Sequence, residues 1–235
     1  MPACAGSVGS LTQLTNCVEC VARFKADCAD TAAIPGLTLT YPAKCNAGSK
    51  PPTFFTLNAV ASGAYNEVGT HFVNNYAVGW YANSDPGDLE ARNYFVFDLS
   101  SVTGTVLSAF LRLSTAPPGF VRYGSDDPSE TFTLFAVSST PIATLTAGTG
   151  NGVSAFSDLG AGSSYGSLVV TPTPGATVDV SFNGTGVAYL QSNANGLVVM
   201  GGAVTTLAKG LTDDEFLFNS TNATLTRQLI VATTE

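Results

Sequence analysis

Along most of the chain, apolar and polar residues alternate with a period of two. The clearest example is residues 105–113. One face carries Leu107, Ala109, Leu111 and Leu113, and the other carries Ser108, Phe110 and Arg112. Successive side chains of a strand point to opposite faces of a sheet, so this pattern predicts a β-strand. Residues 92–99 are a second strong strand, joined to the first by a short polar connection.

Weaker alternation predicts further strands between turns rich in Gly, Pro and Asn. A short helix is expected over residues 185–190, with Thr185 as its N-cap. So many short strands with little helix between them predict an all-β protein, an antiparallel β-sandwich for which a jelly roll suits the length. The weaker strands are residues 53–60, 72–81, 131–137, 167–171, 176–182, 197–200, 215–218 and 226–232.

The first fifth of the chain follows a different period. From Cys17 to Cys28, apolar residues recur at i, i+4, i+7 and i+11, which predicts an amphipathic helix over residues 10–30. Several prolines then mark a linker. We therefore expect two parts, a small cysteine-rich helical head over residues 1–50 and a β-sandwich over residues 53–235.

The cysteine pattern favours disulfides in the head. A zinc site needs two close pairs or added histidines, whereas only Cys17 and Cys20 are close together. Cys17 and Cys28 lie about 16 Å apart along the expected helix, too far for a bridge to each other. The odd number leaves at least one cysteine free or bonded to another chain. We expect the following cysteines to staple the head, as in an exported protein: Cys4, Cys17, Cys20, Cys28 and Cys45.

Charge and composition exclude several classes of partner. Nine Lys and Arg against 17 Asp and Glu give a net charge of −8, and the basic residues are scattered singly, which argues against nucleic acid and anionic lipid. Only 11% of residues are charged, against roughly 25% in an average domain. No apolar run approaches the roughly 20 residues of a membrane span. We expect a secreted or cell-surface protein in its mature form, since no secretory leader is recognisable.

Two neighbouring segments carry a resemblance to a known family. Residues 92–100 are an arginine-led strand ending in Phe-Asp-Leu-Ser, and residues 106–113 follow in the form Val-x-x-Ala-x-Leu-x-Leu. Together they resemble exported bacterial jelly-roll modules of the DNRLRE type, over about residues 53–235. The resemblance implies a cell-surface, matrix or carbohydrate-associated module rather than an enzyme. The cysteine-rich head lies outside that pattern.

Catalytic chemistry has little support in the sequence, and we expect no catalytic residue. His71 is the only histidine, and no Gly-x-Ser-x-Gly motif is present, so nucleophilic catalysis lacks its usual base. We expect His71 to be structural or at the surface. Glycoside hydrolysis needs two carboxylates about 5 to 9.5 Å apart. Glu90 and Asp98 are the best candidates because they flank the strongest strand.

Acidic loop clusters suggest one possible cofactor, Ca²⁺, which takes six to eight oxygen ligands. None of the clusters matches an EF-hand loop, and solvated turn residues are the alternative interpretation. The candidate ligands are Asp85, Asp88, Glu90, Asp126, Asp127, Asp213 and Asp214.

Sugar-binding side chains gather in one stretch. Tyr76, Trp80 and Tyr81 could stack on sugar rings beside the amide of Asn83. Since Trp80 alternates with Tyr76 on one face, a place in the core is the alternative. Three Asn-x-Ser/Thr sequons could accept glycans in a glycosylating host, at Asn183, Asn219 and Asn222.

These observations predict an exported extracellular structural or adhesive subunit that self-assembles into a filament or surface layer. Its partners would be copies of itself or other cell-surface and matrix components, joined through the terminal strand 226–232 and the odd cysteine. The alternative is a carbohydrate-binding, lectin-like module with a structural Ca²⁺.

Overall fold

The computed structural model describes residues 52–82, 87–114, 129–171, 177–210, 214–218 and 226–234. The predicted helical head and its cysteines lie outside the described residues, and the compact unit treated below begins at Thr53. Its strands are β1 (Thr53–Asn58), β2 (Ala61–Asn66), β3 (His71–Val73), β4 (Val78–Tyr81), β5 (Leu89–Asp98), β6 (Thr105–Ser114), β7 (Glu130–Ala136), β8 (Ser164–Val170), β9 (Thr177–Ser181), β10 (Leu197–Val204), β11 (Glu215–Leu217) and β12 (Arg227–Thr234), and its helices are α2 (Ile142–Ala147), α3 (Gly152–Asp158) and α4 (Gly184–Ser192).

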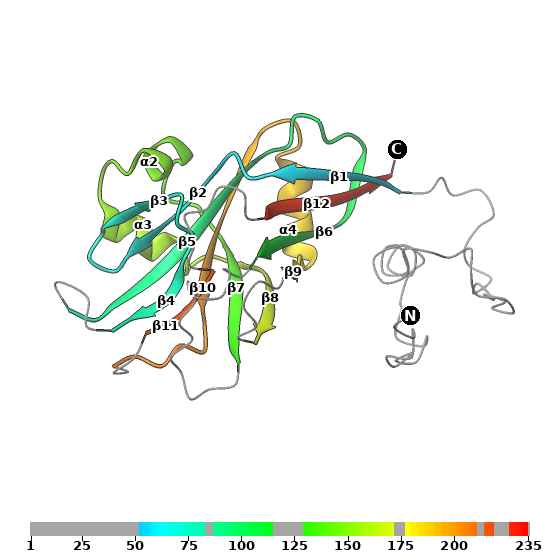
Figure 1. Cartoon of the computed structure of the whole chain (residues 1–235). Coiled ribbons are helices and arrows are strands. Elements are labelled where there is room, and N and C mark those ends of the chain that lie inside the picture. The colour runs from blue at the N-terminus through cyan, green and yellow to red at the C-terminus, as the bar shows by residue number, and fades with distance from the viewer. Residues whose placement is uncertain are drawn as a thin grey trace, which may run out of the picture. The chain divides into compact units, whose positions relative to one another are not determined.

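These strands form two antiparallel sheets. The smaller has the order β1-β12-β6-β9, and the larger has the order β11-β4-β5-β10-β7-β8, with β2 also paired to β5 and β3 to β2. Figure 1 shows α2 and α3 beside β2 and β3, and α4 near β6 and β9. The prediction of an antiparallel all-β fold is confirmed at this level. None of the described helices is long and apolar enough to cross a membrane.

The main core lies between the two sheets. Leu111 of β6 and Leu229 of β12 meet Phe95 and Phe97 of β5 there, and all four side chains are buried. Phe110 belongs to the opposite face of β6 and is half-buried. The predicted two-faced pattern is therefore confirmed for residues 109–113. At the start of β6 a register shift against β12 places Val106 in the core instead of Leu107, so the prediction for Leu107 is wrong.

A second apolar layer covers the outer face of the larger sheet. Tyr94 and Val96 of β5 point to this side, where they pack with Leu145 of α2 and Phe156 of α3. Strand β5 is thus buried on both faces, which explains its nearly continuous apolar sequence. Helices α2 and α3 were not predicted from the sequence, because they are short and carry no acidic residue in the first turn and no basic residue in the last.

Two predicted elements need correction. The single strand predicted over residues 72–81 is wrong, because β3 ends at Val73 and β4 begins at Val78. Between them Asn74 adopts a φ of 61°, a left-handed conformation that ends a strand. The helix predicted from Thr185 begins one residue earlier, and its N-cap is Asn183, whose side chain accepts the Gly186 N–H.

Candidate functional site

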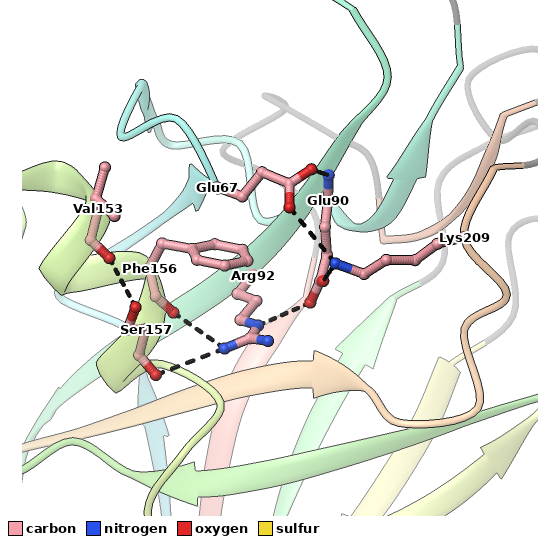
Figure 2. A network of polar contacts seen from close by, with 7 residues as sticks. All are labelled: Glu67, Glu90, Arg92, Val153, Phe156, Ser157 and Lys209. Carbon is pink, nitrogen blue, oxygen red and sulfur yellow. Dashed lines mark hydrogen bonds and ion pairs between the residues drawn. The ribbon is translucent and has the colours of Figure 1, made fainter.

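Polar side chains converge at the beginning of β5 (Figure 2). Glu90 lies there with only 5% of its surface exposed. Its Oε1 accepts a hydrogen bond from Arg92 Nε at 2.8 Å, and its Oε2 lies 2.6 Å from Lys209 Nζ. Each carboxylate oxygen of Glu90 therefore has its own cation, which offsets the cost of burying the charge.

Glu67 extends this network from the end of β2. Its Oε2 lies 3.4 Å from Lys209 Nζ, and its Oε1 accepts the Glu90 backbone N–H at 3.1 Å. The hydrogen bond to Glu90, together with both carboxylate charges, raises the pKa of Lys209 despite partial burial. Lys209 therefore acts as a fixed cation between two carboxylates.

Arg92 connects β5 to the end of α3. Its guanidinium lies 4.2 Å from the centre of the Phe156 ring and donates a long hydrogen bond, 3.4 Å, to the Phe156 carbonyl. The last carbonyls of a helix have no partner within it and favour a nearby cation. Arg92 thus holds α3 against the sheet (Figure 2).

The geometry does not support the carboxylate pair proposed for hydrolysis. Glu90 and Asp98 lie near opposite ends of β5, about 26 Å apart at the rise of roughly 3.3 Å per strand residue. Asp98 is exposed, and the Ser100 backbone N–H that it accepts lowers its pKa. The two carboxyl groups therefore cannot act on one glycosidic bond.

His71, the first residue of β3, packs between aromatic side chains. Its ring stacks on Tyr65 at 4.5 Å between centroids, and its Nε2 lies 2.9 Å from the Tyr94 hydroxyl. Burial lowers the pKa of His71 and so favours the neutral ring. Gly148 ends α2 beside this ring, where a Cβ would overlap His71 Nδ1. His71 thus helps to hold α2 on the sheet.

The candidate calcium ligands do not converge in the part of the chain that the structure describes. Glu90 is neutralised by Arg92 and Lys209, and Asp214 Oδ1 accepts the Ala82 N–H at 2.9 Å. No group of three or more His, Cys, Asp or Glu side chains that could hold a metal occurs among the described residues. Asp88 is exposed near the start of β5. Asp85, Asp126, Asp127 and Asp213 lie outside the described residues.

The aromatic residues expected to stack on sugars are mostly core residues. Tyr76 is fully buried and donates its hydroxyl hydrogen to the Ser114 carbonyl, and Trp80 is 6% exposed. Tyr81 stacks on Phe216, and burial raises its pKa. Since a sugar needs a ring face that solvent reaches, Tyr76 and Trp80 form no such platform. Asn83 lies outside the described residues.

The sequon at Asn183 has a structural role in α4. Its Nδ2 donates to the Ser164 carbonyl at 2.8 Å, and its Oδ1 accepts the Gly186 N–H at 3.0 Å. The residue is exposed, but a glycan on Nδ2 would compete with the first of these bonds. Asn219 and Asn222 lie outside the described residues.

A shallow hollow of about 520 Å³ beside α3 is the second place where polar groups gather, lined mainly by serines and by Asp158. Burial alone would raise the pKa of Asp158, but the backbone N–H groups of Ser138, Ser139 and Thr140 outweigh it and lower the pKa. Their hydrogen bonds are 2.7 to 3.1 Å long. Asp158 therefore fixes the loop that precedes α2.

The network around Glu90 was not predicted from the sequence. The spacing of two between Glu90 and Arg92 on a predicted strand could have indicated a pair on one face. Lys209 gave no such signal, because the fold alone brings it to β5. No family model matches the chain, and no curated protein matches it either.

Proposed function

We propose that this chain is an exported structural or adhesive subunit of a cell surface or matrix, and that it assembles with copies of itself. The proposal rests on the roles of the charged and aromatic side chains that could otherwise have bound or acted on a ligand. Glu90 and Arg92 hold a helix to a sheet, Asp158 fixes a loop, and Tyr76 and Trp80 fill the core. Such residues stabilise a rigid scaffold instead of facing a substrate.

The cysteine count supports assembly. Five cysteines cannot all pair within one chain, so an oxidising environment leaves one available for a bond to a neighbour. In this proposal the sandwich supplies rigidity, the head supplies attachment, and the chain does no catalysis. The low charge and the many Thr, Ser, Asn and Gly residues fit an extracellular surface.

Sedimentation velocity and negative-stain microscopy of the purified full chain, with and without reductant, test the proposal. We expect concentration-dependent oligomers or filaments whose size falls when disulfides are reduced. A single monomeric species at every concentration, with no cross-chain disulfide on non-reducing electrophoresis, would contradict self-assembly.

The lectin-like alternative is less well supported, because its two best stacking rings are buried. A glycan array probed with and without a chelator distinguishes the two functions. Under the structural proposal we expect no glycan signal that depends on Ca²⁺.

A further inference from the structure

Strand β1 has one edge that no other described strand pairs with. It is the last strand of the smaller sheet and pairs only with β12 among the described strands. Ala59 donates its N–H to the Arg227 carbonyl, so by alternation residues 53, 55 and 57 bond to β12. The backbone N–H and C=O groups of Phe54, Thr56 and Asn58 therefore face away from the sheet.

The other described edge strands are shorter or blocked. Strand β9 carries Asp179, which pairs with Arg112, while β3 and β11 have three residues each. Strand β8 is irregular, because its Tyr165 is an extra residue without a partner in the register with β7, and the Tyr165 carbonyl accepts the Asn183 N–H. Charges, short strands and irregularities are the usual protection of sheet edges against pairing.

Strand β1 has none of these protections. Its six residues, Thr-Phe-Phe-Thr-Leu-Asn, include no charge and no proline, and its register with β12 is uninterrupted. Phe54 is 38% exposed. A long, uncharged and regular edge is a site where another strand can be added through main-chain hydrogen bonds.

Resting on the self-assembly proposed above, we infer that β1 is the docking edge for a second copy of this chain. Two β1 strands would pair antiparallel about a two-fold axis, with Thr56 opposite Thr56 of the second copy. This register keeps the outward-facing N–H and C=O groups bonded in pairs. It joins the two small sheets into one continuous sheet.

Self-complementarity identifies the partner as a second copy. The register places Phe55 opposite Leu57 of the second copy, and the two-fold axis repeats this apolar pair. Both side chains are half-buried and already pack against the core between the sheets, so pairing extends that core across the interface. Basic partners would be attracted by the net charge of −8, but this edge has no charged side chain to bind them.

A lysine at position 56 tests the inference. Thr56 is exposed, so Thr56→Lys leaves the core unchanged but sets two ammonium groups opposite each other on the axis, where like charges repel. We expect the dissociation constant of the dimer, measured by sedimentation velocity of the full chain under reducing conditions, to rise at least tenfold. Thr177→Lys is the matched control, because Thr177 is an exposed residue of β9 at the opposite edge of the same sheet. We expect this control to dimerise like the wild type.

Hydrogen exchange provides a readout that needs no variant. The amides of Phe54, Thr56 and Asn58 should gain protection as concentration rises, whereas the Phe55 amide, bonded to β12, should be protected throughout. If Thr56→Lys assembles like the wild type and these amides stay unprotected, edge pairing is wrong while self-assembly stands. If the wild type is monomeric only under reductant, edge pairing alone is wrong. If it is monomeric at every concentration both with and without reductant, both proposals fall.

Discussion

At the scale of single residues, several charged side chains in the described part of the chain connect elements that are far apart in sequence. Arg92 joins two parts of the chain that are far apart in sequence, since it bonds to Glu90 on its own strand and to a carbonyl of α3. Arg112, in contrast, pairs with Asp179 on the outer face of the small sheet, and both side chains are more than one third exposed. The two arginines form similar ion pairs in different surroundings, so they should differ in their effect on stability.

Replacing Arg92 should therefore cost far more than replacing Arg112. Arg92→Met leaves the buried Glu90 with one cation and the end of α3 without its donor, so we expect the free energy of unfolding to fall by about 2–4 kcal/mol. Arg112→Met should cost about 0–1 kcal/mol, because exposed pairs contribute little. Urea unfolding of both variants measures the difference. Equal losses would mean that Arg92 does not hold α3.

Asp158 should make the free energy of unfolding depend on pH in the acidic range. Its pKa in the folded protein lies below the ordinary value of 3.8, so its contribution is fully present above that value and is lost as pH falls through the lower folded pKa. We expect Asp158→Asn to lower the free energy of unfolding at neutral pH by about 1–3 kcal/mol.

The pH dependence of this loss identifies its cause. The difference between wild type and Asp158→Asn should shrink below about pH 4, where the unfolded carboxyl takes up a proton. Asp179→Asn, at an exposed pair, is the control and should change stability little at any pH. A difference for Asp158→Asn that stays constant with pH would point to lost packing instead of charge.

At the scale of elements, the second apolar layer depends on close approach of α3 to β10. A Cβ on Gly201 would overlap backbone atoms of Leu159, which directly follows α3. Since backbone atoms cannot rotate away as a side chain does, only glycine fits at this position. The layer of α2 and α3 in turn buries the outer face of β5, where Tyr94 and Val96 lie.

Gly201→Ala should consequently loosen this layer. We expect a loss of about 1–3 kcal/mol in the free energy of unfolding, from overpacking against a rigid neighbour. Gly184→Ala is the matched control, since a Cβ there meets nothing within 4 Å at the beginning of α4, and it should be neutral or slightly stabilising. Thermal unfolding of both variants distinguishes the two positions. Similar melting temperatures for the two variants would show that the backbone at Leu159 can shift to make room for a Cβ at position 201.

At the scale of the whole molecule, pairing of two β1 strands closes on itself and gives a dimer. Growth beyond a dimer needs a second, different contact, which the odd cysteine of the head could supply through a cross-chain disulfide. Strand β12, expected to take part in assembly, is a central strand paired to β1 and β6, so a strand of a second copy cannot simply be added beside it. The open edge of this sheet belongs to its neighbour β1.

Reduction should therefore divide any filament into dimers but no further. The disulfide contact is lost under reductant, whereas the main-chain bonds of the β1 edge remain. Size-exclusion chromatography with light scattering on the reduced wild type and on reduced Thr56→Lys measures both steps. If the reduced wild type is monomeric, disulfides alone hold the assembly together and the β1 edge does not pair.

The strands were predictable wherever one face met the core and the other met solvent. Residues 109–113 alternate for this reason, and β6 forms as expected. Strand β2 was missed because its sequence, Ala-Ser-Gly-Ala-Tyr-Asn, contains no β-branched residue and no regular alternation. The network around Glu90 could be predicted only in part, since Glu67, Glu90 and Lys209 come from three separate segments.

The sequence by itself determined the antiparallel β-rich class, the low charge of the surface and the inward face of β6, because each depends on local periodicity or on composition. Only the tertiary structure decided that Tyr76 and Trp80 are buried, that Glu90 is neutralised by Arg92 and Lys209, and that β1 rather than β12 lies at the edge. These features depend on which strands become neighbours. That choice is made by long-range packing, which leaves no periodic signal along the chain.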